Sequence, residues 1–159
     1  MEIKIRKAAD AEMELLLQWR MRVLREVFSL GANADTDKLK QANEEYYRLH
    51  LADGSHTACF AMNDDGELIG CGGICYQEEM PSPDNENGTC GYLMNIYALP
   101  EYRGRGVGRK IVEYLLAEAK ERGTQKIYLE SSDMAMSLYQ EIGFTPLEGY
   151  MKLEEMCSR

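Results

Sequence analysis

The sequence predicts an α/β (α+β) fold in which strands and helices follow one another along the chain. Two observations support this class: apolar and polar residues alternate in several short runs, which is typical of strands, and elsewhere apolar residues recur at the spacing of one helix face. Residues 1–159 contain no repeat, low-complexity segment or linker, and 159 residues are enough to bury a core. We therefore expect a single domain.

The first half of the chain contains patterns for a strand, two helices and a β-hairpin. In the first helix Met13, Leu17 and Leu24 share an apolar stripe, whereas the second helix is more polar. The segment Asn63-Asp64-Asp65-Gly66 favours a tight turn between two strands. In chain order the expected elements are strand 2–7, helix 10–29, helix 36–51, strand 57–63 and strand 67–77.

The second half begins with a loop at 81–88 that is too polar and too rich in proline to form an element. An apolar run then ends at Pro100, and a helical pattern begins at Val107. In chain order we expect strand 92–99, a helix from 107 to about Gly123, strand 126–130, a short helix over 135–142 and a final strand pair around 145–156.

The segment Arg103-Gly104-Arg105-Gly106-Val107-Gly108 joins the apolar run to the helix that follows it. A strand, a glycine turn and a helix N-terminus together present backbone N–H groups to an anion. Glycines at alternate positions let the backbone curve around phosphate oxygens. Arg109 and Lys110 add positive charge here, although the chain carries a net charge of −9. We therefore predict a site for a phosphorylated cofactor.

The spacing of these glycines separates the cofactor classes. Glycines at 104, 106 and 108 do not fit G-x-G-x-x-G, and Gly108-Arg109-Lys110 does not fit a P-loop. The segment instead resembles the pyrophosphate loop of the GNAT N-acetyltransferase superfamily, Arg/Gln-x-x-Gly-x-Gly/Ala, with Arg103, Gly106 and Gly108 in its fixed places. The alternative is a glycine-rich turn that only caps a helix.

A second segment, Ala135 to Phe144, resembles the A-x-x-L-Y-x-x-x-G-F motif of the same superfamily. In that family the tyrosine, here Tyr139, points at the sulfur of coenzyme A. A phenol stays protonated at neutral pH and can protonate a leaving thiolate, so Tyr139 is the expected catalytic acid. The alternative is a tyrosine of the core. Many relatives carry an asparagine seven residues before the tyrosine, where this chain has Ser132.

The resemblance implies a fold, a cofactor and a reaction. The fold is a mixed, mostly antiparallel sheet of six to seven strands with about four helices. The reaction is acetyl transfer from acetyl-CoA to a primary amine of a small molecule or peptide, by direct attack in a ternary complex and without a metal. A backbone N–H near Ala98 would stabilise the carbonyl oxygen. The cofactor-binding residues it implies are Ile96, Tyr97, Ala98, Arg103, Gly104, Arg105, Gly106, Val107, Gly108, Arg109 and Ser132.

The general base and the acceptor remain open. Carboxylates that could serve as a base are Glu26, Glu78, Glu79, Glu86 and Glu130. Deprotonation through water, or binding of an already neutral amine, is equally consistent with the sequence. The family builds its acceptor site from the first two helices and the loop before the cofactor strand, here Trp19, Arg20, Arg22, Arg25, Tyr46, Tyr47 and the acidic stretch 78–86.

The charge of that region favours no single acceptor. The acidic stretch suits a cationic amine such as a polyamine, an aminoglycoside or a lysine side chain. Arg20 and Arg25 would equally suit the carboxylate of an amino acid. Acetylation of a protein N-terminus is a third alternative. A non-catalytic acyl-CoA-binding module, serving as a sensor or partner subunit, is the alternative to an enzyme.

Composition restricts the remaining partners. A pI near 4.8 without a basic patch argues against nucleic acid. No apolar run or leader pattern indicates a membrane span or export, so we expect a cytoplasmic protein, and we keep a homodimer open. The five cysteines have no metal-binding spacing. His50 and His56, the two histidines, fall in or near a polar turn, which argues against a histidine-based metal site or triad.

Overall fold

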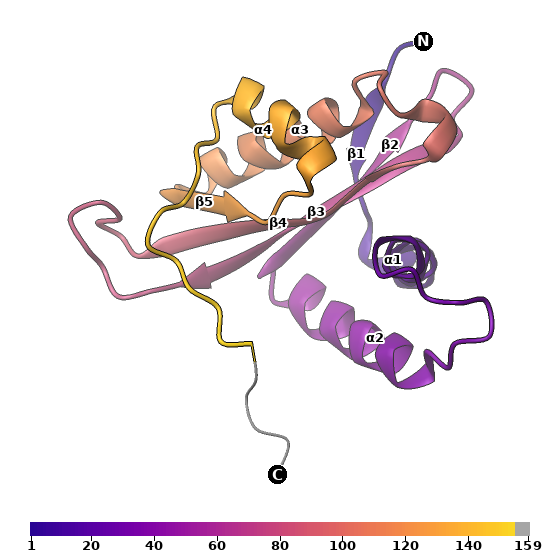
Figure 1. Ribbon diagram of the computed structural model, residues 1–159, viewed down its shortest axis with the longest axis horizontal. Coiled ribbons are helices and arrows are strands. Elements are labelled where there is room, and N and C mark those ends of the chain that lie inside the picture. The colour runs from indigo at the N-terminus through magenta and orange to yellow at the C-terminus, as the bar shows by residue number, and fades with distance from the viewer. Residues whose placement is uncertain (155–159) are drawn as a thin grey trace.

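The computed structural model describes residues 1–154, in which a five-stranded sheet has helices on both faces. Helices α1 and α2 cover one face, and α3 and α4 cover the other (Figure 1). The helices are α1 (Met13–Val27), α2 (Asp37–Ala52), α3 (Val107–Glu121) and α4 (Met136–Ile142). The strands are β1 (Lys4–Lys7), β2 (His56–Met62), β3 (Leu68–Glu78), β4 (Thr89–Ala98) and β5 (Lys126–Leu129).

The strands lie side by side in the order β1-β2-β3-β4-β5. The first four pair antiparallel, and β4 pairs with β5 in parallel, so the sheet is mixed and mostly antiparallel as the sequence predicts. The fold class is confirmed, but the expectation of six to seven strands is wrong for the described residues, which form five.

The difference in strand count comes from the C-terminal segment. Residues 145–154 contain none of the expected final strand pair. Pro146 has no N–H to donate to a ladder, and Gly149 has a φ of 81°, which lies outside the strand region. The end of the expected pair, 155–156, lies outside the described residues.

The first helix is shorter than the apolar stripe indicates, because the chain leaves the helix after Val27. Ser29 adopts a left-handed φ of 49°. Its N–H donates to the carbonyl of Glu26, and the N–H of Leu30 donates to the carbonyl of Arg25 at 2.9 Å. This pair of bonds is a Schellman motif with serine where glycine is usual.

Among residues 1–154, none of the helices has the length and apolar character that a membrane span requires.

Strand β4 carries a bulge that opens one side of the sheet. The register with β3 shifts between Cys71 and Gly73, and Asn95 opposite them has a φ of 60°. Strand β5 pairs with β4 only from Cys90 to Leu93. Beyond Leu93, β4 therefore has β3 as its only strand neighbour in the described residues, and its other edge is left without a partner strand.

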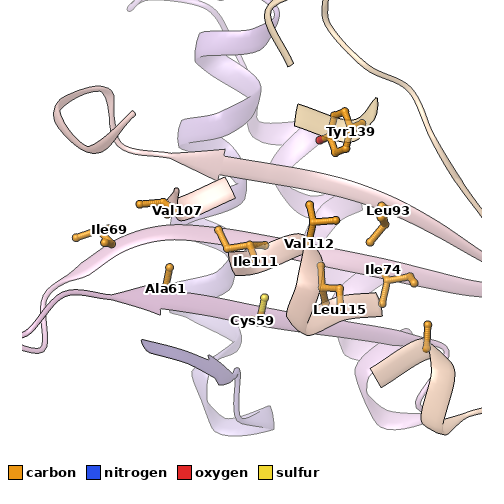
Figure 2. Close-up of a cluster of buried hydrophobic side chains, with 11 residues drawn as sticks. Cys59, Ala61, Ile69, Ile74, Leu93, Val107, Ile111, Val112, Leu115 and Tyr139 are labelled. Carbon is orange, nitrogen blue, oxygen red and sulfur yellow. The ribbon is translucent and has the colours of Figure 1, made fainter. Parts of the chain in front are cut away.

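Glycines in β3 let α3 approach the sheet closely. A Cβ at Gly72 would lie 2.3 Å from Cγ2 of Ile111 on α3, and one at Gly70 would lie 2.6 Å from the carbonyl oxygen of Tyr97. Val107, Ile111 and Leu115 line the face of α3 that meets the sheet, and all are buried (Figure 2). Close packing over this face fixes where α3 begins relative to β4.

Candidate active site

Residues 103–108, which we call the glycine loop, lead into α3 as the sequence predicts. Gly104 and Gly106 have φ values of 72° and 86°, which favour glycine, and a Cβ at either would meet nothing within 4 Å. Helix α3 begins at Val107, and no side chain of the described residues caps it. The first amides of a helix have no partner within it. The loop therefore has unpartnered N–H groups beside open space, an arrangement that suits an anion.

The arginines around this loop are largely engaged by protein groups. The Nε of Arg103 donates to the carbonyl of Ala98 at 3.1 Å, and its guanidinium is bound to the carboxylate of Glu26. Arg109 is bound to Glu141 on α4. Arg105 lies over the ring of a neighbouring tyrosine and has no carboxylate partner among residues 1–154. The backbone of this loop is thus freer to bind a ligand than the side chains of Arg103 and Arg109.

Tyr139 lies on α4, where it is 7% exposed and joins the same buried cluster as Val112 and Leu93 (Figure 2). It lines a cavity of about 380 Å³ between β5, α4 and the residues that follow α4; we call this the Tyr139 cavity. Burial raises the pKa of its phenol, which is therefore protonated at neutral pH. Its hydroxyl forms no hydrogen bond with any described residue, so it is available to a ligand.

Helix α4 is placed beside the glycine loop by direct packing. A Cβ at Gly108 would lie 3.3 Å from Cδ2 of Leu138, the residue before Tyr139. Gly143 ends α4 with a φ of 119°. Ser132 is exposed and precedes the 3₁₀ turn Asp133–Ala135 that leads into α4. The two segments that the sequence singles out, separated by about thirty residues, are therefore neighbours in the fold.

The end of β4 presents one backbone amide to the open side of the sheet. The N–H of Leu99 donates to the carbonyl of Ile69 on β3 at 2.9 Å. Because neighbouring residues of a strand direct their amides to opposite sides, the N–H of Ala98 points toward the edge where β5 no longer pairs. Ile96 and Ala98 pack against the cluster on the α3 face, whereas Tyr97 belongs to the cluster on the α1 face.

The carboxylates that the sequence offers as bases do not enter the site. Glu78, Glu86 and Glu130 are exposed. Glu79 is bound to Lys126. Glu26 accepts hydrogen bonds from Tyr97 and Arg103, which hold its pKa below the usual range. None of these carboxylates lines the Tyr139 cavity.

A second cavity, of about 190 Å³, lies between α1, α2 and β4. We call it the α1–α2 cavity, and its lining residues are Arg20, Ala42, Asn43, Tyr46, Tyr47, His56, Met94 and Asn95. Among the residues expected at the acceptor site, Arg20, Tyr46 and Tyr47 line it. Trp19, Arg22, Arg25 and the acidic stretch 78–86 do not.

Five of its lining residues were not expected at the acceptor site from the sequence, namely Ala42, Asn43, His56, Met94 and Asn95. Asn95 is the bulge residue of β4, and the only local sign was an amide in an otherwise apolar strand, since asparagine tolerates a positive φ. His56, which the sequence places in or near a polar turn, begins β2 directly after the bend at 53–55 and is 6% exposed, a burial that the sequence does not indicate. Burial lowers its pKa to about 4. The hydroxyl of Tyr46 lies 3.0 Å from its Nδ1 and 2.8 Å from Sγ of Cys75.

The cysteines and histidines form no metal centre in the part of the chain that the structure describes. No group of three or more histidine, cysteine, aspartate or glutamate side chains could hold a metal ion there. Cys59, Cys71, Cys75 and Cys90 are free thiols, and Cys157 lies outside the described residues. Burial raises the pKa of the Cys75 thiol.

The described residues thus bring together an uncapped helix start, an open strand edge and a protonated tyrosine. The model of the acetyltransferase (GNAT) family matches residues 16–144. This match covers most of the chain, which therefore belongs to the GNAT family.

Individual relatives agree with this assignment. The chain is 29% identical over 133 residues to the uncharacterised N-acetyltransferase YjgM of Escherichia coli strain K12, covering 80% of this chain and 75% of that protein. It is 26% identical over 101 residues to the glucosamine 6-phosphate N-acetyltransferase of Trypanosoma brucei brucei, covering 64% and 67%.

Among solved structures, one described as a predicted acetyltransferase with acetyl-CoA, from Clostridium acetobutylicum, superposes with a TM-score of 0.83. It is 27% identical, and the match covers 96% of each chain. The protein is thus an N-acetyltransferase, and its relatives support acetyl-CoA as the acetyl donor.

Proposed function

We propose that this protein transfers an acetyl group directly from acetyl-CoA to the primary amine of a small molecule, with Tyr139 as the proton donor. The observation that carries this proposal is the Tyr139 hydroxyl, which is without a hydrogen-bond partner among residues 1–154 and lies on a helix packed against the start of α3. Unlike the hydroxyl of Tyr76, which is buried without a partner, the Tyr139 hydroxyl is not sealed in the interior, so a ligand in the Tyr139 cavity can reach it.

The glycine loop would hold the pyrophosphate of acetyl-CoA. The amides that follow Gly106 fit an anion because they are uncapped, and a positive φ at Gly104 and Gly106 turns the backbone around open space. Arg105 adds a guanidinium with no carboxylate partner in the described part. Arg103 would act through the position of the loop, because its own guanidinium is bound to Glu26.

The chain then supplies two groups for the chemistry. The amide of Ala98 faces the open edge of β4 and would donate to the carbonyl oxygen as negative charge develops on it. Tyr139 would protonate the departing thiolate, a role for which its raised pKa keeps the proton in place beforehand. The thioester itself supplies the activated acetyl group.

The acceptor amine would lose its proton to water or bind in its neutral form, since none of the carboxylates considered lines either cavity. Placing the amine next to the thioester provides much of the rate in such a direct transfer. No covalent enzyme intermediate is then required.

Release of free thiol from acetyl-CoA, measured with and without acceptor, tests the proposal. The acceptor panel contains polyamines, aminoglycosides, free amino acids and N-terminal peptides. We expect release that depends on one class of acceptor, with the acetylated product identified by mass. Binding of coenzyme A in calorimetry without release for any amine would contradict the proposal and favour a binding module.

A further inference from the structure

We propose that the acceptor is a small amino acid-like amine whose carboxylate is bound by Arg20 in the α1–α2 cavity. This inference rests on the proposed function and adds the chemical class of the acceptor. It selects one of the alternatives that the sequence leaves open, and it does so from the charge, the size and the position of the cavity.

The charge of the α1–α2 cavity is carried by Arg20. No aspartate or glutamate lines it, and His56 is neutral at physiological pH because burial lowers its pKa to about 4. A polyamine or an aminoglycoside carries several ammonium groups, which this lining would not balance. The carboxylate of an acceptor would instead balance the positive charge of Arg20.

Arg20 is held in place by neutral groups. Its Nε donates to Oδ1 of Asn43 at 3.0 Å, and one terminal nitrogen donates to Oδ1 of Asn95 at 3.1 Å. No carboxylate of the described residues lies within ion-pair distance of it. By contrast Arg6, which is also half-buried, is paired with Glu12 at 2.7 Å.

A guanidinium has five N–H donors, so the two hydrogen bonds from Arg20 to Asn43 and Asn95 leave further N–H groups for a ligand. A partly buried guanidinium without an anion is costly unless a partner arrives. Arginine is also suited to bind both oxygens of a carboxylate at once. The two asparagines would then keep the guanidinium oriented before the ligand binds.

The size of the cavity limits the part of the acceptor that it can hold to a small group. Its volume is about 190 Å³, somewhat above the roughly 150 Å³ that accommodates a benzene ring in an apolar cavity. Tyr46, Tyr47 and Met94 supply walls that suit an apolar side chain. A multi-ring aminoglycoside would not fit wholly within it, whereas a small amino acid would.

The α1–α2 cavity borders the part of β4 that has no β5 partner. Asn95 lines the cavity and is also the bulge residue of β4, within the stretch that has no β5 partner. Ala98 lies three residues later in this stretch, and its amide would donate a hydrogen bond to the carbonyl oxygen of the thioester. With its carboxylate on Arg20, a bound amino acid could direct its amine toward this open edge.

The first test compares acceptors on the wild-type protein. The standard amino acids are assayed by thiol release beside polyamines, aminoglycosides and N-terminal peptides. The best amino acid is then compared with its carboxamide and its decarboxylated amine. We expect amino acids to be the preferred class and the loss of the carboxylate to lower kcat/KM by about 30-fold or more.

Two other outcomes separate this inference from the proposed function. If an amine without a carboxylate is the best acceptor, or the carboxamide is used as well as the amino acid, the inference is wrong while the proposed function stands. If no acceptor gives release, the proposed function fails, and the inference fails with it.

The second test uses Arg20→Gln, with Arg48→Gln on the exposed side of α2 as the control. In Arg20→Gln, we expect KM for the amino acid to rise about 30-fold, with little change for its carboxamide, and Arg20→Lys to restore part of the difference. Arg48→Gln should match the wild type. An equal loss for the amino acid and the carboxamide in Arg20→Gln would show a purely structural role and overturn the inference.

Discussion

The guanidinium of Arg103, which opens the glycine loop, is bound to the carboxylate of Glu26 on α1. The hydroxyl of Tyr97 on β4 donates to the same carboxylate at 2.6 Å. One carboxylate thus connects α1, β4 and the loop that would hold the cofactor. The hydrogen bonds from Tyr97 and Arg103 lower the pKa of Glu26, so it is ionised at neutral pH and is a poor candidate for the general base.

Glu26→Gln should loosen the glycine loop while leaving the fold intact. The side chains of Arg103 and Glu26 are both 42% exposed, so solvent limits the free energy that this ion pair contributes to about 1 kcal/mol, which corresponds to about fivefold in affinity. We expect KM for acetyl-CoA to rise by about that factor. Glu45→Gln removes a comparable exposed carboxylate that is paired with Arg48, and its steady-state kinetics should match the wild type.

Tyr139→Phe should lower kcat by roughly 10²- to 10⁴-fold, because the proton donor for the thiolate is lost. Affinity for coenzyme A, measured by calorimetry, should change little, since the ring and its packing are kept. Tyr114→Phe, on α3 beside the same buried cluster, is the matched control and should retain full turnover. Wild-type turnover in Tyr139→Phe would exclude the acid role.

Gly106→Val should abolish binding of coenzyme A in calorimetry. The branched side chain disfavours the φ of 86° and projects into the space beside the uncapped amides. Gly66→Val is the control, because Gly66 has a φ of 79°, is equally open and lies in the turn between β2 and β3.

Both glycine variants should lose about 1–2 kcal/mol of stability from the same backbone strain. Only the variant in the loop should lose the ligand. Thermal unfolding of each variant checks that both remain folded, and retained binding by folded Gly106→Val would refute the assignment of the loop.

The buried His56 should make stability depend on pH. Its folded pKa of about 4 lies below the unfolded value of 6.5, so the unfolded chain binds more protons between these two values. The free energy of unfolding therefore falls as pH decreases through this window, and the titration of His56 contributes up to about 3 kcal/mol to this fall. Urea unfolding at about pH 7 and about pH 5 measures the change.

The variant His56→Gln should be less stable at neutral pH, because it loses the contact with Tyr46, but it should show a smaller pH dependence than the wild type. His50→Gln removes a neighbouring group that also lowers the pKa of His56, so it should reduce the pH dependence less than His56→Gln does. An identical slope in His56→Gln would show that another group titrates in this range.

The sequence predicted the parts of the site that depend on local backbone chemistry. The loop from Arg103 to Gly108 leads into α3 at Val107, and the segment around Tyr139 forms a short helix that ends at Gly143. In each case the residues that define the conformation lie within about ten positions of one another. The final strand pair was mispredicted, because apolar residues around Pro146 and Gly149 do not by themselves make a ladder.

The tertiary structure decided which distant residues meet. Arg20 reaches Asn95 across 75 positions, and Arg103 reaches Glu26 across 77. The sequence could name each of these arginines but could not assign its partner, and it did not indicate that His56 is buried. Such contacts depend on how the helices pack across the sheet and on the bulge at Asn95, and these result from the sum of many weak interactions over the whole core. The sequence alone therefore determined the conformation of the glycine loop and the family resemblance, whereas the arrangement of the α1–α2 cavity followed from packing.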